Sequence, residues 1–398
     1  MIRIEDLYKV YLIARSNKRR KNDAVSFEFN LERNLTELCE AINNRTYRAF
    51  SNYTFVVTHP RPREVFAAEI QLRIIHTYID WRLRPLMESE LTERTFNNRK
   101  GYGTDRAINQ VIEDVYDVSK GFTKDAWIIK WDLTGYFPNA NCDIVYRQFI
   151  DLVQRRYDGD DKEDLLWMLM ICVYSDPARH CYRKSPISAW DDIEPSKSLF
   201  NKPFGIGGAI GFLLWQNAMN YYLNDIDHWA VDTLGLHYTR FVDDTVIVVN
   251  NKEAALSLIP LFRERYNRLG VEMHKRKFYC QHYTKGVEFI GSHIKMDRIY
   301  LNNRIISRAK RKVAIMNSWS EKRKYFNIEE FISIINCYLG MMKRRNEYRN
   351  SVKILSMIDD SWYKFIKKDV DNMKVVAKKA YNHRNLLKYK HNLKFKKI

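Results

Sequence analysis

Three aspartates lie at the ends of apolar segments that read as β-strands. Asp132 ends the segment AWIIKWD (126–132), and Asp243 and Asp244 stand between LHYTRF and TVIVV, where two strands would join in a tight hairpin. A carboxylate at the end of a buried strand is costly unless a cation meets it. Arginine or lysine partners are one solution. Two magnesium ions are the other, because Mg²⁺ takes oxygen ligands and leaves room for substrate phosphates in phosphoryl transfer.

The composition of the chain favours a polyanionic partner. The 398 residues include 67 Lys and Arg against 48 Asp and Glu, which gives a formal charge of +19. Such an excess attracts nucleic acid. Hydrophobic residues make up 45% of the chain, so it folds, and its length suffices for more than one core. The 14 Gly, 9 Pro and 6 Cys exclude collagen-like, low-complexity and disulfide-scaffold proteins.

The sequence gives little support to a membrane location. Charged residues interrupt the N-terminal segment where a signal peptide would need an apolar stretch. The longest weakly polar run, residues 205–215, is too short to cross a bilayer. The cysteines form no C-x-x-C pair, so neither a zinc site nor a disulfide framework is indicated. We therefore expect a cytoplasmic protein without a membrane partner.

The order of the expected elements indicates an α+β fold. Strands are expected over 126–133, 236–241, 245–249 and 286–294, and helices over 143–157, 164–173, 212–227 and 252–269. After residue 304 the pattern is helical, over 307–319, 328–343 and 349–370. The C-terminal segment is strongly basic and interleaved with aromatic residues, which suits phosphate contacts and base stacking. A solvated tail is the alternative. The lysines expected to bind nucleic acid there are Lys388, Lys390, Lys394, Lys396 and Lys397.

Two segments resemble the catalytic motifs of reverse transcriptases. The first is DLTGYF (132–137), and the second, RFVDDTVIV (240–248), is similar to the Y/F-x-D-D motif of these enzymes. The likeness continues in order along residues 55–345. Its further segments are RPREVFAAEIQLRIIH (61–76), FNNRKGYGTDRAI (96–108), FGIGGAIGFLLWQNAMNYYLNDID (204–227), LGVEMHKRK (269–277) and KGVEFIGSHI (285–294).

This resemblance implies a right-hand polymerase with a helical thumb. Residues 1–125 would form N-terminal helices and fingers, 126–304 the palm with further fingers elements, 305–370 the thumb and 371–398 a basic tail. The implied reaction is the addition of deoxynucleotides to a 3′-OH on an RNA template, which makes RNA, DNA and dNTPs the partners. The resemblance leaves a protein partner or a homo-oligomer open.

The resemblance also assigns roles to residues of the catalytic site. Asp132, Asp243 and Asp244 would hold two Mg²⁺ ions, with Mn²⁺ able to substitute and the Leu133 carbonyl as a further ligand. Phe137 falls where the family excludes a ribose 2′-OH, although it could instead be a core aromatic residue.

Further residues of the resemblance would bind the substrates. Those expected to clamp the triphosphate are Arg63, Arg73, Arg99 and Lys100. Lys277 matches a lysine that would protonate the leaving pyrophosphate. Gly211 and Gln216 would lie under the template base and the incoming nucleotide.

The closest branch in this resemblance is that of diversity-generating retroelements. Their usual I-G-x-x-x-S-Q pattern stands here at 210–216 with Trp215 in place of serine. A tryptophan there could stack on a template base or fill the core beside Ala209 and Ala218. The departure favours a diverged relative that restricts phage and copies a dedicated noncoding RNA. A retroelement enzyme with a small basic accessory protein, and a nucleic-acid-binding protein with a vestigial site, remain the alternatives.

Overall fold

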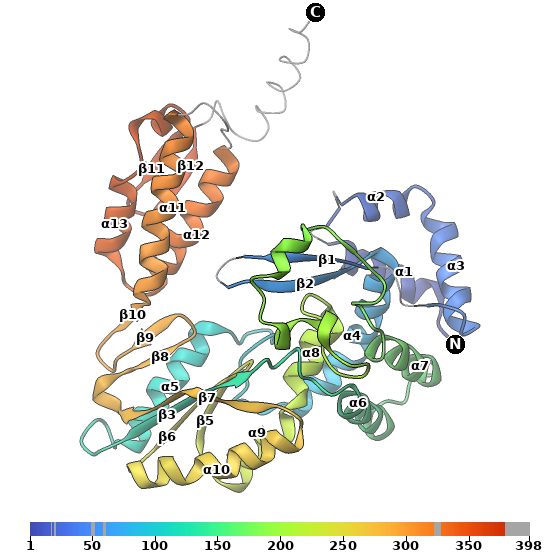
Figure 1. Cartoon of the computed structure of the whole chain (residues 1–398), viewed down its shortest axis with the longest axis horizontal. Coiled ribbons are helices and arrows are strands. Elements are labelled where there is room, and N and C mark those ends of the chain that lie inside the picture. The colour runs from blue at the N-terminus through green and yellow to red at the C-terminus, as the bar shows by residue number, and fades with distance from the viewer. Residues whose placement is uncertain (17, 20, 49–51, 59–60, 322–327, 379–398) are drawn as a thin grey trace, which may run out of the picture. The chain divides into compact units, whose positions relative to one another are not determined.

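The computed structural model describes residues 1–378, apart from 17, 20, 49–51, 59–60 and 322–327. The chain divides into two compact units, residues 1–281 and 282–398 (Figure 1). Both units mix helices and strands, which confirms the α+β class. No helix of the described residues is long and apolar enough to cross a membrane.

The first unit is built around a four-stranded sheet in the order β5–β6–β3–β7. These strands are β5 (His237–Phe241), β6 (Asp244–Val249), β3 (Trp127–Thr134) and β7 (Glu272–His282). β6 runs antiparallel to both of its neighbours. Its positions 245–248 are all buried, because α5 (Thr104–Val118) and α10 (Lys252–Arg268) both pack against the sheet. β6 therefore does not alternate between apolar and polar residues.

A second sheet of the first unit has the order β2–β1–β4. Its strands are β1 (Asn52–Val57), β2 (Arg63–Ala68) and β4 (Cys181–Arg183). The remaining helices of this unit are α1 (Ile4–Arg15), α2 (Asn22–Glu28), α3 (Leu31–Asn43), α4 (Ile70–Glu90), α6 (Cys142–Arg156), α7 (Lys162–Val173), α8 (Leu213–Tyr222) and α9 (Asn224–His228). Asn141 caps the N-terminus of α6, where its side chain accepts hydrogen bonds from the Asp143 and Ile144 amides.

The second unit has its own core, around Phe331, Ile335, Leu339 and Trp362. Its helices are α11 (Asn303–Glu321), α12 (Ile328–Arg344) and α13 (Tyr348–Ser356), and its strands are β8 (Val287–Phe289), β9 (Ser292–Ile294), β10 (Ile299–Leu301), β11 (Ile366–Asp369) and β12 (Lys374–Ala377). The short helices of the chain are η1 (Ile187–Trp190), η2 (Pro195–Lys197), η3 (Leu199–Asn201), η4 (Trp229–Thr233), η5 (Tyr283–Lys285) and η6 (Asp360–Lys364).

Two parts of the second unit differ from the sequence prediction. The strand expected over 286–294 is a hairpin, because Ile290 and Gly291 both take positive φ angles of 46° and 71° and turn the chain. The helix expected over 349–370 ends at Ser356, and residues 366–377 form the antiparallel hairpin of β11 and β12. Asp369 stabilises that turn by accepting a hydrogen bond from the Asn372 amide at 3.1 Å.

Candidate active site

The sheet of the first unit brings the three predicted aspartates together. Asp243 and Asp244 lie at the hairpin of β5 and β6, where Phe241 pairs with Asp244. β3 lies beside β6 with Trp131 opposite Thr245, so the next position along β3, Asp132, lies beside Asp244. Leu133 follows in the same strand with a buried side chain. Residues 111 positions apart in sequence therefore share one end of the sheet.

The carboxylates perturb one another. Burial, followed by the charges of Asp132 and Asp244, raises the pKa of Asp243 to about 7. A hydrogen bond between the side chains of Asp132 and Asp243 acts in the same direction. Carboxylates this close cannot all ionise without repulsion, and a cation relieves that repulsion. A pKa raised by burial and by specific neighbours is typical of functional sites.

Lys130 supplies one positive charge to this cluster. Its Nζ lies 3.0 Å from Asp244 Oδ1, and Lys130 is two residues before Asp132 on the same face of β3. Within the described part of the chain, no three His, Cys, Asp or Glu side chains already have the arrangement of a metal site. The donor set nevertheless fits Mg²⁺ in kind, because it offers carboxylate oxygens that repel one another.

The hairpin between β5 and β6 contains a strained residue. Val242, directly before Asp243, has a φ of 60°, which is unfavourable for a β-branched side chain. Both of its backbone polar groups are held by side chains. The Val242 amide donates to Asn97 Oδ1 at 2.9 Å, and its carbonyl accepts from the Arg240 guanidinium at 3.0 Å. These two contacts fix the conformation that presents Asp243.

A fully buried ion pair holds Arg240, which bonds the Val242 carbonyl. The guanidinium of Arg240 bonds both carboxylate oxygens of Asp227, and both side chains are 0% exposed. Asp227 also accepts hydrogen bonds from Thr95 and from Tyr238. The charge of Arg240 is thereby compensated, which a buried guanidinium requires. Asn97, Arg240 and Asp227 thus form a clamp on the hairpin.

The turn after β3 places Phe137 near the glycine-containing segment 204–211. Phe137 is partly buried, and its carbonyl accepts a hydrogen bond from the Gly208 amide at 2.8 Å. Gly211 has a φ of 108°, and a Cβ there would lie 2.2 Å from the Phe66 carbonyl oxygen. Glycine is therefore required where this segment crosses β2. Gln216 is exposed on α8.

Of the two positions left open for Trp215, the structure has the one in the core. Its side chain is 1% exposed, and a Cβ added at Gly208 would lie only 2.5 Å from the indole ring. The absence of a side chain at Gly208 creates the space that the indole fills. Trp215 therefore packs in the core of the first unit.

Two of the four expected triphosphate residues are engaged elsewhere. Arg99 donates to Glu88 at 2.8 Å and to the Thr92 and Thr95 carbonyls, and its side chain is 6% exposed. Arg73 is buried, where it bonds the Ala68 carbonyl at 2.7 Å and Asp23 at 3.3 Å. Both arginines bond local backbone and carboxylate groups here, and their role at the triphosphate stays a prediction.

The remaining predicted residues have varied locations. Arg63 and Lys100 are exposed, so their role stays a prediction. Lys277 lies in β7, and its side chain is outside the described part of the structure. The five lysines of the tail, Lys388, Lys390, Lys394, Lys396 and Lys397, also lie outside the described residues.

The sequence prediction missed Asn97, Lys130, Asp227 and Arg240. Lys130 lies two residues before Asp132 and Arg240 three residues before Asp243, and an isolated charge next to buried strand positions was an available signal. Nothing in the local sequence of Asn97 or Asp227 shows that either would reach the β5–β6 hairpin.

The family follows from comparison with known sequences. Residues 59–294 match the family described as reverse transcriptase (RNA-dependent DNA polymerase). The chain belongs to the reverse transcriptase family. The matched region includes the three clustered aspartates and the clamp on the hairpin. Membership of this family confirms the resemblance drawn from the motifs and the right-hand polymerase fold that it implied. The bacterial branch stays a prediction.

Solved structures of telomerase are similar to this reverse transcriptase, at low identity. Apo telomerase from Candida tropicalis, truncated at its C-terminal domain, shares 12% identity with a TM-score of 0.45, over 64% of this chain and 56% of that one. Telomerase from Candida albicans with a TWJ fragment of telomeric RNA shares 10% with a TM-score of 0.44, over 79% and 57%. The chain thus spans little more than half of these telomerases. No curated protein sequence matches it.

Proposed function

We propose that this reverse transcriptase copies RNA into DNA by adding deoxynucleotides to a primer 3′-OH. The observation that carries the proposal is the cluster of Asp132, Asp243 and Asp244, in which the pKa of Asp243 is raised to about 7 by burial and by the other two carboxylates. A vestigial site would have no reason to keep three repelling carboxylates beside a strained hairpin. This argues against a protein that only binds nucleic acid.

The three aspartates are proposed to hold two Mg²⁺ ions, with Mn²⁺ able to substitute. When bound, such ions activate the attacking 3′-oxygen and neutralise charge on the triphosphate. Lys130 compensates the charge of Asp244 in their absence. The clamp on Val242 keeps Asp243 directed toward its neighbours before substrate arrives. Preorganisation of this kind lowers the cost of reaching the transition state.

The biological role proposed for this activity is phage restriction in the bacterial cytoplasm. The support is the motif at 210–216, which departs from the retroelement pattern at Trp215. Because the indole is buried, the departure changes the core under this segment and not a template-facing surface. The proposed template is a structured noncoding RNA, and sequencing of copurified nucleic acid before and after addition of dNTPs would identify it.

Primer extension on RNA with Mg²⁺ and dNTPs tests the polymerase assignment. We expect Asp243→Asn/Asp244→Asn to abolish incorporation while the far-UV circular dichroism spectrum is retained. Glu113→Gln/Asp117→Asn is the matched control, since it removes two exposed carboxylates of α5 and should leave extension unchanged. Undiminished extension by the first variant would show that these carboxylates do not carry the reaction. EDTA should stop extension by the parent protein.

A further inference from the structure

The clamp on the β5–β6 hairpin depends on a short turn formed by Asn97 and Asn98, the 97–98 turn. Just before it, Thr95 pairs with Arg240 of β5. The chain then changes direction at Asn98, which takes a positive φ of 54°. Asparagine tolerates this conformation better than most residues, but the conformation persists only where surrounding groups hold it. The placement of the 97–98 turn determines whether the Asn97 side chain reaches the Val242 amide.

Arg84 of α4 bonds this turn directly. Its Nη1 donates to the Asn98 carbonyl at 3.2 Å. Its other two nitrogens are held by α4 itself and by α8. Nε donates to Asp80 Oδ2 at 3.0 Å, and Nη2 lies 2.9 Å from Asp80 Oδ1 and 3.4 Å from Asn217 Oδ1. A guanidinium with all three nitrogens engaged presents its donors to the turn in one geometry.

Asp80 is placed to hold that guanidinium. It lies four residues before Arg84, on the same face of α4, and accepts a further hydrogen bond from the Asn217 side-chain amide. Burial raises the pKa of Asp80, and the hydrogen bond and charge of Arg84 oppose that rise. Because the Arg84 side chain is 37% exposed, the pair adds little to stability. The loss of Arg84 should therefore affect local geometry more than folding.

Asn220 of α8 bonds the same turn. Its side-chain amide donates to the Asn97 carbonyl at 3.0 Å, and its own carbonyl accepts from Arg240 Nη2 at 2.8 Å. Both carbonyls of the 97–98 turn are thus bonded by side chains of other elements. The hairpin is held in the same manner, and the bond from the Val242 amide to Asn97 joins the two segments. A shift of the turn is therefore passed to the hairpin.

We propose that Arg84 is a positioning residue for Asp243. It acts through the Asn98 carbonyl, which fixes the turn, and through Asn97, which holds the amide of the residue before Asp243. Without Arg84, Asn98 should leave its positive φ, Asn97 should move with it, and the Val242 amide should lose its acceptor. The inference rests on the proposed polymerase function, because that function gives Asp243 its catalytic role.

Hydrogen–deuterium exchange of the full-length protein tests these contacts without an assay of activity. In Arg84→Met, the Val242 amide should exchange about tenfold faster than in the parent, because it loses the protection of one buried hydrogen bond. Arg84→Lys keeps a donor for the Asn98 carbonyl and should restore part of the protection. Asp80→Asn weakens the hold on the guanidinium and should also accelerate exchange, which keeps the test decisive if Arg84→Met does not fold.

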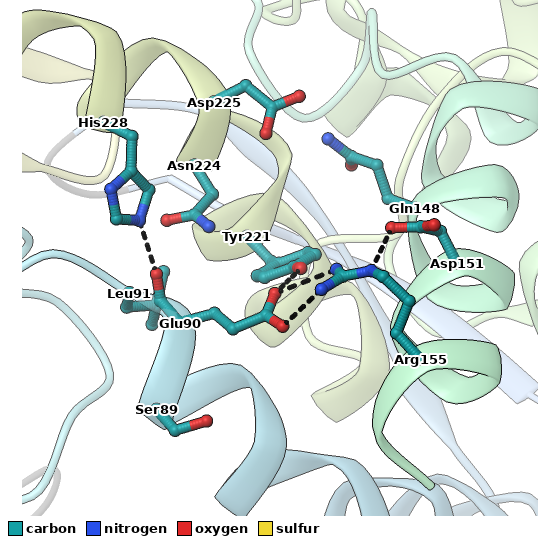
Figure 2. Close-up of a pocket in the computed structure, with 10 residues that line it drawn as sticks. All are labelled: Ser89, Glu90, Leu91, Gln148, Asp151, Arg155, Tyr221, Asn224, Asp225 and His228. Carbon is teal, nitrogen blue, oxygen red and sulfur yellow. Dashed lines mark hydrogen bonds and ion pairs between the residues drawn. The ribbon is translucent and has the colours of Figure 1, made fainter. Parts of the chain in front are cut away.

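Arg155→Met is the matched control. Like Arg84, Arg155 bonds a carboxylate four residues before it, Asp151 at 2.9 Å, and it also pairs with Glu90 at 3.0 Å (Figure 2). Within the described part of the chain, neither carboxylate bonds the 97–98 turn or the hairpin. Exchange at Val242 should therefore stay at the parent rate in this variant, even where the loss of two ion pairs lowers the melting temperature.

Primer extension supplies the catalytic readout. Arg84→Met should lower kcat about tenfold with little change in the KM for dNTP. In the Asn97→Ala background it should have almost no further effect, because both substitutions interrupt the same series of contacts. Arg84→Lys should recover part of kcat, as it recovers part of the protection.

Three outcomes would overturn the positioning role. The first is parent-like exchange at Val242 in Arg84→Met, and the second is equal acceleration in Arg155→Met. The third is additive loss of kcat when Arg84→Met is combined with Asn97→Ala. The polymerase assignment is tested separately by Asp243→Asn/Asp244→Asn, and exchange at Val242 decides on Arg84 whether or not that assignment holds.

Discussion

At the scale of single residues, Phe137 offers a direct test of substrate selection. Its ring is partly buried in the turn after β3, beside the segment that contains Gly211. If the ring excludes a 2′-OH, Phe137→Val should admit ribonucleotides. We expect the ratio of rNTP to dNTP incorporation to rise by about tenfold, equivalent to about 1.4 kcal/mol of lost discrimination. Single-nucleotide incorporation measures this ratio. Unchanged discrimination together with a lower melting temperature would make Phe137 a packing residue only.

The acidic cluster predicts a pH dependence of stability in metal-free buffer. Burial and the neighbouring carboxylates raise the pKa of Asp243 from 3.8 to about 7 in the folded state. The folded protein therefore holds a proton that the unfolded chain releases, and the stability due to this proton is present at low pH. It is lost as the pH rises from about 4 to about 7, by at most about 1.4 kcal/mol per pH unit. Asp243→Asn should flatten this part of the profile in urea unfolding. An identical profile for parent and variant would contradict the shift.

At the scale of elements, the hairpin of β5 and β6 depends on side chains from other segments. The side-chain oxygen of Asn97 accepts a hydrogen bond from the Val242 amide. Without that bond, in Asn97→Ala, the strained Val242 should relax and Asp243 should move from its position beside the other carboxylates. We expect kcat to fall by about tenfold, the cost of one buried hydrogen bond, with little change in the KM for dNTP. Steady-state primer extension separates the two constants. Asn98→Gly is the neighbouring control, since the Asn98 side chain is exposed and donates to the Gln216 carbonyl, and glycine keeps the positive φ of 54° at this position without strain.

A second substitution distinguishes this positioning role from a general loss of stability. Glycine adopts a positive φ without strain, so Val242→Gly in the Asn97→Ala background should restore part of kcat. A role of Asn97 in stability alone would leave kcat unrescued, because Val242→Gly adds no packing.

The elements also show where sequence reasoning succeeds. The alternation of buried strands and turn residues placed Asp132, Asp243 and Asp244 at strand ends, and backbone pairing then joins them. The direction in which a side chain points was harder to predict from the sequence. The spacing in α8 does not reveal that Trp215 faces Gly208, and Arg99 is held by carbonyl groups that belong to the tertiary fold. The hairpin of β11 and β12 was missed, although Ile366 and Val375 of its two strands are both buried in the second core.

At the scale of the whole molecule, the densest run of basic residues and the three clustered carboxylates belong to different parts of the chain. The carboxylates lie in the first unit, whereas the densest run of positive charge in the sequence is at the C-terminal end of the second. Residues 379–398 contain seven Lys and Arg and no Asp or Glu. Affinity for RNA and catalysis should therefore be separable, because phosphate contacts contribute binding that does not depend on the reacting atoms.

Deletion of the basic tail tests this separation, and the fold determines where to cut. Val375 in β12 is 0% exposed and belongs to the second core, so removal of residues 371–398 would damage that unit. A chain that ends at Lys378 keeps the β11–β12 hairpin. This truncation should bind RNA more weakly and with a flatter salt dependence, since each lost phosphate contact reduces the log–log slope by about 0.7 to 0.9. Fluorescence anisotropy over a range of KCl concentrations measures that slope. Replacement of the seven basic residues by glutamine keeps the tail length and should have the same effect. Equal slopes for parent and both variants would leave the tail a solvated extension.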